Sequence, residues 1–231
     1  MGTWKPGEYY DDGHWMGERK YAPRWPANYA TIRFAMQAQA ILLLEPKADV
    51  LDLGSGNGMF AAMLWHMGHR GRYVGADFSP GVTREAIEGN SDRGGHQQAT
   101  FQLIDLDGAS VTGLCANHGL DIANLVVTSG ECLEHMKNDR RLIATVPEGV
   151  PCVVSLPCFD DPSHIRWWPT VEQLEAYWKP FFEPESWRVK WIEYKNRAPE
   201  SWCYLFSGVR NDVGRTTEWP ATVGGPPQEV R

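Results

Sequence analysis

Three glycines at alternate positions, directly after a short apolar run, form the most informative segment of this chain. The segment is Val50-Leu51-Asp52-Leu53-Gly54-Ser55-Gly56-Asn57-Gly58. Glycine allows positive φ and lets the main chain approach a ligand that side chains would exclude. Such a pattern is typical of a buried parallel strand that turns sharply into a helix, with a ligand over the helix N-terminus. We therefore expect a ligand site formed by Asp52, Gly54, Ser55, Gly56 and Gly58.

The spacing of these glycines argues against two other glycine-rich motifs. A dinucleotide fingerprint would need glycine at position 59, where this chain has Met59. A P-loop would need Gly-Lys followed by Ser or Thr, which the segment lacks. The loop is therefore expected to hold a different ligand.

A second acid ends the next apolar segment, Tyr73-Val74-Gly75-Ala76-Asp77. A carboxylate roughly twenty residues past the glycines can accept hydrogen bonds from both hydroxyls of a ribose. Phe78 beside it offers a face on which a flat base can stack. Asp77 could instead cap the helix that begins near Pro80, but Ser79 fills that role equally well.

A third apolar segment, 100–104, leads into Asp105-Leu106-Asp107. An acid at this edge can accept a hydrogen bond from the amino group of adenine, and we assign that role to Asp105. A fourth segment, 121–128, runs into Ser129-Gly130-Glu131.

Taken together, these segments resemble the class I S-adenosylmethionine (SAM) dependent methyltransferases, over positions 48 to about 182. The glycine loop resembles motif I of that family, and the fourth segment resembles the start of motif IV, although the usual aromatic residue is here Leu120. The resemblance implies SAM as the cofactor and S-adenosylhomocysteine (SAH) as the product. It implies that the cofactor contacts the loop residues named above together with Asp77, Phe78, Asp105, Leu106 and Ser129.

A second set of chemically capable residues follows the fourth segment, in Glu131-Cys132-Leu133-Glu134-His135. On a helix, residues at i, i+3 and i+4 share one face, so Glu131, Glu134 and His135 are expected to converge. Two close carboxylates repel unless they are protonated, hydrogen-bonded or bridged by a cation. With His164 from a later loop, this set suits a divalent metal such as Mg²⁺, Mn²⁺, Fe²⁺ or Zn²⁺.

This pattern resembles the metal site of small-RNA 2′-O-methyltransferases of the HEN type, and also the matching segment of ubiquinone-pathway O-methyltransferases. Many class I methyltransferases carry a similar segment with no metal assigned. The alternative is therefore that Glu131 caps helix amides and His135 packs under the loop. Without a metal, imidazole is the best general base, so the catalytic candidates are His135 and His164, together with Glu131.

An alternation of strands and helices is expected to position these groups. Apolar runs predict strands near 49–53, 72–77, 100–104, 121–128, 150–156, 187–194 and 202–209. Helical patterns lie between them, near 29–44, 58–67, 80–89, 110–117, 131–145 and 170–180. Strands with little alternation suit a parallel sheet covered on both faces, and the last two strands are expected to form an antiparallel hairpin. The resemblance implies an α/β, Rossmann-like sheet of seven strands in the order 3-2-1-4-5-7-6, with strand 7 antiparallel.

We expect the SAM-dependent methyltransferase domain over 29–210. Before it lies an aromatic-rich segment, 1–28, which is either a lid over a cleft or an extension packed on the surface. The stretch 211–231 is expected to be a flexible tail.

Bulk properties narrow the function classes. With 231 residues, 42% hydrophobic content and a net charge of −7, the chain suits one globular domain and argues against a general nucleic-acid or membrane-surface binder. Five cysteines without a C-x-x-C pair fit buried thiols in a reducing cytoplasm, and no apolar run reaches membrane length.

Three functions remain after these considerations. The first is methyl transfer to an oxygen or nitrogen atom of a small molecule, which the acidic balance and the compact length favour. The second is a metal-dependent RNA ribose methyltransferase, supported by the Glu/His set and opposed by the charge. The third is a SAM-binding module without catalytic activity.

Overall fold

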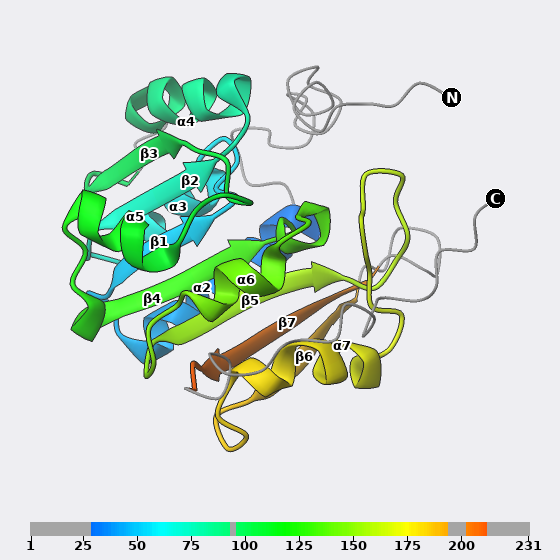
Figure 1. The fold of residues 1–231 in the computed structure, drawn as a ribbon. Helices are drawn as coiled ribbons and strands as arrows, with labels where there is room; N and C mark the ends of the chain where they lie inside the picture. The colour runs from blue at the N-terminus through cyan, green and yellow to red at the C-terminus, as the bar shows by residue number, and fades with distance from the viewer. Residues whose placement is uncertain (1–28, 93–95, 194–201, 212–231) are drawn as a thin grey trace.

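The computed structural model describes residues 29–92, 96–193 and 202–211, so the aromatic segment 1–28 and tail residues 212–231 lie outside the described residues. A seven-stranded sheet in the order β3-β2-β1-β4-β5-β7-β6 forms its centre (Figure 1). The strands are β1 (Asp49–Leu53), β2 (Tyr73–Asp77), β3 (Ala99–Leu103), β4 (Leu125–Gly130), β5 (Pro151–Pro157), β6 (Arg188–Glu193) and β7 (Trp202–Val209). Strand β7 pairs antiparallel with both β5 and β6, whereas the other neighbours pair in parallel. The expected strand order and the antiparallel seventh strand are confirmed.

Helices cover both faces of the sheet. The helices are α2 (Tyr29–Leu44), α3 (Met59–His66), α4 (Pro80–Asp92), α5 (Val111–His118), α6 (Asp139–Ala144) and α7 (Val171–Trp178). One hydrophobic cluster joins α2 and α3 to the sheet, and another joins α5, α6 and α7 to the opposite face. Among the described residues, no helix combines the length and the apolar character needed to span a bilayer.

Strand β1 combines three apolar residues, Val50, Leu51 and Leu53, with two buried acids, Asp49 and Asp52. All five of its residues are buried. Val50 belongs to the cluster with α2 and α3, whereas Leu51 and Leu53 belong to the cluster with α5, α6 and α7. A strand covered on both faces has no side turned to solvent. The glycine loop therefore follows a fully buried strand.

Two expected elements differ from the structure around β4. Strand β4 begins only at Leu125, because Asp121 caps a short 3₁₀ turn, Ile122–Asn124, by accepting a hydrogen bond from the Ala123 N–H at 3.0 Å. The helix expected over 131–145 is wrong in its first half. A 3₁₀ turn, Leu133–His135, is followed by extended backbone at Met136, and α6 forms only from Asp139.

Candidate active site

The glycine loop lies at the carboxyl end of β1 and leads into α3. Its three glycines have φ of 81° at Gly54, 55° at Gly56 and 79° at Gly58. The loop folds back onto β2, since the main-chain N–H groups of Gly54 and Ser55 both donate to the carbonyl oxygen of Ala76. The φ values of all three glycines lie in the left-handed region, which favours glycine.

Close packing adds a second reason for glycine at position 54. A Cβ atom there would lie 2.4 Å from the Cβ and Sγ atoms of Cys132. That residue follows β4, so the first glycine lets the β4 loop press against the β1 loop. Cys132 therefore supports the loop on one side, and the loop presents its main chain to the pocket on the other side.

The acid at the end of β2 contacts the glycine loop directly. Asp77 Oδ2 accepts a hydrogen bond from the Gly56 N–H at 2.9 Å, and Asp77 Oδ1 accepts one from the Ser79 N–H at 2.9 Å. The structure thus brings together two segments that are neighbours only through β1 and β2 pairing. Ser79 also caps α4, with the Val82 nitrogen 3.4 Å from its Oγ, so Asp77 is not needed for that role and its contact with a ribose stays a prediction.

Asp52, the acid at the start of the loop, is buried beside the pocket. It accepts a hydrogen bond from the Tyr73 hydroxyl group. Burial raises the pKa of the Asp52 carboxyl to about 7, against the opposing effects of the Tyr73 hydrogen bond and the nearby Arg33. Asp52 is therefore poised to change its charge near neutral pH.

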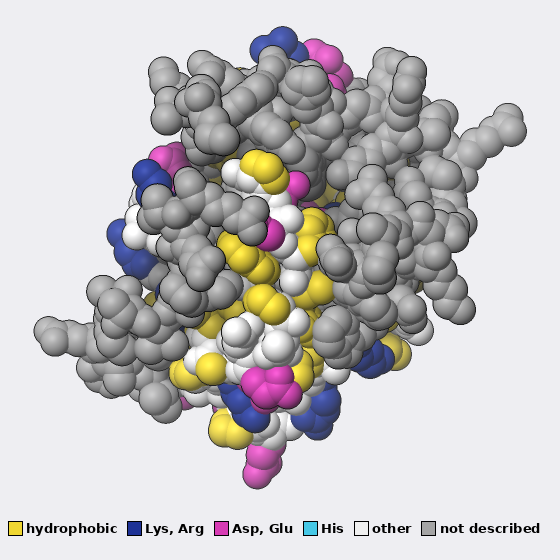
Figure 2. Space-filling view, turned by 90° about the vertical axis from the view of Figure 1, so that its right-hand side faces the viewer, with side chains coloured by type: hydrophobic (Ala, Val, Ile, Leu, Met, Phe, Trp, Pro, Cys, Tyr) yellow, Lys and Arg dark blue, Asp and Glu magenta, His cyan; other side chains and the backbone are white. Residues whose placement is uncertain are grey.

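A pocket opens between the glycine loop and α2. Its lining includes the loop residues together with the following side chains: Arg33, Phe34, Gln37, Asp52, Asn57, Met59 and Phe60. The carboxyl ends of the parallel strands, where the glycine loop lies, point to the right in Figure 1, and Figure 2 looks onto that side. Hydrophobic side chains and a few carboxylates gather there between the atoms that are not described.

Arg33 and Gln37 are site residues that the sequence interpretation missed. They stand four residues apart on an otherwise largely apolar helix, so they share one face of α2. Gln37 donates to Thr128 Oγ1 at 2.7 Å and to the Ser129 carbonyl oxygen at 3.0 Å. Two polar residues at this spacing in an apolar helix are a signal that could have identified them.

The remaining expected cofactor contacts lie around the same edge of the sheet. Phe78 is half-buried and Asp105 is exposed, whereas Leu106 is buried in the core. Asp105 Oδ1 accepts a hydrogen bond from the Asp107 N–H at 2.9 Å. Ser129 is buried and donates to the Leu53 carbonyl oxygen at 2.8 Å. Their contacts with a cofactor remain predictions.

Glu131 does not lie on a helical face with Glu134 and His135. Its φ of 52° is the one positive value among the described non-glycine residues. Its main-chain N–H continues the sheet pattern by donating to the Ser155 carbonyl oxygen at 3.0 Å, and this conformation cannot begin a right-handed helix. The carboxylate instead lies 3.9 Å from Arg33 Nε.

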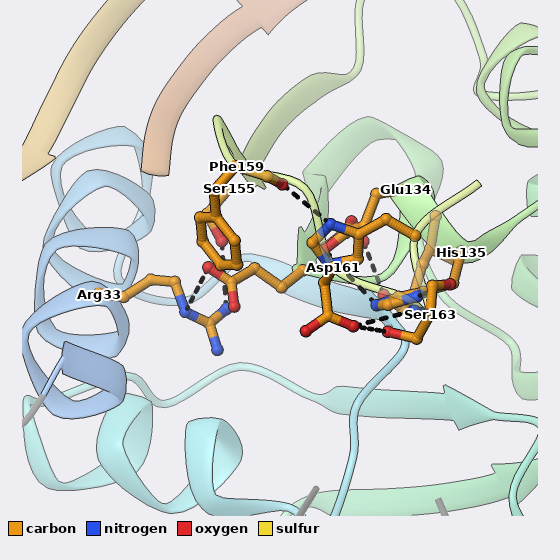
Figure 3. Close-up of polar contacts among 11 residues, drawn as sticks. Arg33, Glu134, His135, Ser155, Phe159, Asp161 and Ser163 are labelled. Carbon is orange, nitrogen blue, oxygen red and sulfur yellow. Dashed lines mark hydrogen bonds and ion pairs between the residues drawn. The ribbon is translucent and has the colours of Figure 1, made fainter. Parts of the chain in front are cut away.

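Glu134, His135 and His164 do converge, although by a different route from the one expected. One ligand atom from each lies within 4.8 Å of the others. The rings of His135 and His164 meet edge to face, with centroids 4.9 Å apart. Figure 3 shows Glu134 and His135 close together, with Asp161 and Ser163 of the neighbouring loop beside them.

Glu134 is fully buried, and neither carboxylate oxygen has a hydrogen-bond partner among the described residues. Burial, and then the nearby Glu131, raise the pKa of Glu134 well above its ordinary value. A buried acid without hydrogen bonds is costly unless it is protonated or a cation neutralises it.

Main-chain carbonyls orient both imidazoles. His135 Nδ1 donates to the Ser163 carbonyl oxygen at 2.9 Å, and His164 Nδ1 donates to the Phe159 carbonyl oxygen at 3.1 Å. In the neutral rings the Nε2 atoms are then the acceptors. Burial lowers the pKa of His135 to about 4 and also lowers the pKa of His164. Two neutral imidazoles held by main-chain carbonyls, together with a buried carboxylate, fit the ligand set of a divalent transition metal.

The loop that carries His164 is fastened to the turn that carries Glu134. The Ile165 N–H donates to the Glu134 carbonyl oxygen at 2.9 Å. Arg166 donates to the Met136 carbonyl oxygen at 2.7 Å and forms an ion pair with Asp139 at 2.6 Å. The cluster therefore depends on contacts between β5–α7 loop residues and the segment after β4, which lie about thirty positions apart.

No protein-family model and no curated protein matches this sequence. Solved structures match by fold. The N-methyltransferase NodS from Bradyrhizobium japonicum, in complex with SAH, superposes with a TM-score of 0.61 at 14% identity, over 89% of this chain and 98% of that one. The magnesium protoporphyrin IX methyltransferase ChlM from Synechocystis, with bound SAH, gives 0.58 at 16% identity, over 89% and 97%.

The cyclase SpnF gives a TM-score of 0.55 at 15% identity, over 79% of this chain and 81% of that one. At such identities the likeness concerns the fold. The chain has the Rossmann-like, seven-stranded fold of class I SAM-dependent methyltransferases.

Proposed function

We propose that this protein transfers a methyl group from SAM to an oxygen or nitrogen atom of a small molecule. One observation carries the proposal: Asp77, at the end of β2, is hydrogen-bonded to the Gly56 amide of the loop that lines the pocket. A loop of main-chain amides beside a ribose-binding carboxylate is the arrangement that an adenosine cofactor requires.

Some residues of the chain would position the cofactor, and others would accept the proton that the acceptor releases. Bound SAM supplies a methyl group activated by its positive sulfur. Asp77 would accept hydrogen bonds from the ribose hydroxyls, Phe78 would stack on the base and Asp105 would accept from its amino group. The loop of Gly54, Gly56 and Gly58 would exclude bulky side chains and water from the methionine portion.

The acceptor would approach from the side of the Glu134, His135 and His164 cluster, which follows β4 and β5. Both imidazoles are neutral at pH 7, because burial lowers the pKa of each. A neutral imidazole can take the proton that the acceptor releases. Glu131 lies near Glu134 and raises the pKa of its carboxyl, but it is paired with Arg33 and shares no helix face with the cluster, so we no longer give it the catalytic role expected from such a face.

The cluster favours a second candidate function, a metal-dependent RNA ribose 2′-O-methyltransferase. The buried Glu134 carboxylate and the Nε2 atoms of His135 and His164 would hold the metal, which would lower the pKa of a bound hydroxyl group. Two imidazoles and one carboxylate suit Zn²⁺, Mn²⁺ or Fe²⁺ better than Mg²⁺. The net charge of −7 opposes a polyanionic substrate, so we rank this function second.

A SAM-binding module without methyl transfer is the third candidate, because the fold itself does not decide the chemistry. The cyclase SpnF has a related fold. In this chain, however, the glycine loop is intact and hydrogen-bonded to Asp77, and Asp52 is hydrogen-bonded to Tyr73.

One experiment distinguishes the three functions. The purified full chain is incubated with methyl-labelled SAM and either an RNA pool or a metabolite pool, with and without a chelator. Label in the metabolite fraction supports the first function. Label in RNA that chelation abolishes rejects it in favour of the second, and tight SAH binding without any labelled product supports the third.

A further inference from the structure

Helix α2 turns polar side chains inward and apolar side chains outward. Arg33 is its one charged residue, and both Arg33 and Gln37 are buried. On the opposite face, Ile32 is 41% exposed and Leu43 is 80% exposed. An ordinary surface helix carries charged residues on its outer face, whereas a helix with apolar residues all round is usually buried. The outer face of α2 therefore has the character of a covered surface.

Four residues form one stripe along this outer face. Ile32, Met36, Gln39 and Leu43 stand at positions i, i+4, i+7 and i+11, which a helix places on one side. We call these four residues the α2 stripe, and none of them is charged. The helix has 16 residues and is therefore about 24 Å long. It lies behind the sheet in Figure 1, on the face opposite to α6 and α7.

The size and the place of the α2 stripe narrow what could cover it. A strip about 24 Å long and about 10 Å wide is well below the roughly 800 Å² per partner that a stable dimer buries. The tail 212–231 follows Asn211, whose N–H donates to the Phe181 carbonyl oxygen at 3.1 Å. Phe181 belongs to the cluster on the other face of the sheet, so the tail starts on the side away from α2. Residues 1–28, by contrast, end directly at Tyr29, the first residue of α2.

The composition of residues 1–28 suits this surface. The segment has no Val, Leu, Ile or Phe, so it cannot build a core of its own, and its Lys and Arg residues balance its Asp and Glu residues. Each aromatic ring that it contains can bury about 150–250 Å². Its aromatic residues are Trp4, Tyr9, Tyr10, Trp15, Tyr21 and Trp25. About seven residues of extended chain span 24 Å, so the segment is long enough to turn back and follow the whole helix.

We propose that residues 1–28 dock along the outer face of α2, with their aromatic side chains packed on the α2 stripe. Pro26 and Asn28, which are residue types that favour turns, would let the chain reverse just before the helix begins. The segment would then lie on the surface of the domain, along the back of the helix that lines the pocket, and not over the pocket itself. This inference does not depend on which cofactor or acceptor the pocket takes.

Limited proteolysis of the full-length protein tests the docking. Chymotrypsin cleaves after aromatic residues, so aromatic side chains packed on α2 are protected from it. The double variant Ile32→Lys/Leu43→Lys places two charges on the α2 stripe, and it should raise the rate of cleavage within 1–28 at least about tenfold over the parent. The matched control is Ile87→Lys, which changes an isoleucine of α4 that is 55% exposed and should leave that rate unchanged. Circular dichroism checks that each variant is folded.

Photo-crosslinking identifies the occupant of the α2 stripe even if the double variant does not fold. Leu43→p-benzoylphenylalanine replaces a side chain that is largely exposed, so the fold should be retained. Equal amounts of this variant with and without isotope labelling are mixed and irradiated, and mass spectrometry then identifies the joined peptides. Cross-links from position 43 to peptides within 1–28 of the same copy are the expected result.

Several outcomes would overturn the proposal. Cross-links between a labelled and an unlabelled copy would show that a second molecule of this protein covers the α2 stripe. Cross-links to 194–201 or 212–231 would assign the stripe to another part of the chain, and the absence of any cross-link would show that nothing in the protein covers it. Equal cleavage rates in the parent, the folded double variant and the Ile87→Lys control would show that the stripe does not protect residues 1–28.

Discussion

Asp77 and Gly56 are joined by a hydrogen bond of 2.9 Å, from the main-chain N–H of the loop to Oδ2 of the acid. The bond links the segment after β1 to the end of β2. The same carboxylate also accepts from the Ser79 N–H through its other oxygen. Asp77 is therefore fixed in orientation before any ligand arrives, which is how a rigid sheet edge can present an acid to a ribose.

Replacing Asp77 should strongly impair cofactor binding. Asp77→Ala removes the acceptor for the ribose hydroxyls and for the Gly56 amide, so SAH affinity should fall by well over tenfold, as expected when charge-assisted hydrogen bonds are lost. Calorimetry measures the change. Asp121→Ala is a suitable control, since Asp121 also accepts a main-chain hydrogen bond but lies before β4; unchanged SAH affinity in Asp77→Ala would remove that residue from the site.

Cofactor binding should be coupled to the ionisation of Asp52. Burial raises the pKa of its carboxyl to about 7, and the positive ammonium group of SAH should lower that pKa in the complex. Below about pH 7 binding then releases a proton, so SAH affinity should rise with pH, by up to about tenfold per unit, and level off above 7.

Calorimetry in two buffers of different ionisation enthalpy measures this proton release directly. Asp52→Asn cannot ionise, yet its side-chain oxygen can still accept from Tyr73. In that variant the apparent enthalpy should no longer depend on the buffer. An equal number of released protons in the parent and in Asp52→Asn would contradict the assignment.

A pair of buried histidines should make the fold sensitive to acid. His69 Nε2 donates to the Ala48 carbonyl oxygen at 2.8 Å, so its Nδ1 accepts from His96 Nε2 at 2.8 Å. His96 Nδ1 then accepts from the Gln98 N–H at 3.2 Å. The Nδ1 atom of each ring can accept its bond only while that ring is neutral, and burial lowers the pKa of His69 and lowers that of His96 to about 3.

In the unfolded chain His96 has an ordinary histidine pKa near 6.5, so it binds a proton at pH values at which the folded state does not. The contribution of His96 to stability is therefore present above about pH 6.5 and is lost as the pH falls toward 3. His96→Gln can keep one donor and one acceptor. Urea unfolding should show that its free energy of unfolding, relative to the parent, improves by about 2 kcal/mol between pH 7.5 and pH 5; a constant difference would show that His96 does not titrate on unfolding.

Local sequence signals were sufficient to place the glycine loop and Asp77 at one edge of the sheet, because each stands at the end of a short apolar strand. They were insufficient for Arg33, whose bond to Ser155 spans 122 positions and exists only once α2 packs on β5. Glu131 was misplaced because helical spacing assumes right-handed backbone, and its φ of 52° is uncommon for a side chain of that size. Glu134, His135 and His164 were nonetheless grouped correctly, since strand ends and loops on one sheet edge meet regardless of the local turn.

Replacing Glu134 should affect the melting temperature in opposite ways, depending on whether a metal is present. Its carboxylate is fully buried and has no hydrogen-bond partner among the described residues. In protein stripped with a chelator, Glu134→Gln removes an acid that burial disfavours, so the melting temperature should stay the same or rise. With Zn²⁺ or Mn²⁺ added, the parent should gain thermal stability through binding to the native state, and Glu134→Gln and His164→Ala should lose most of that gain.

Asp105→Asn, which changes an exposed acid outside the cluster, should retain the gain in full. Equal stabilisation of the parent and both cluster variants by either metal would show that the ion binds elsewhere, and would leave His135 and His164 with a role in proton transfer alone.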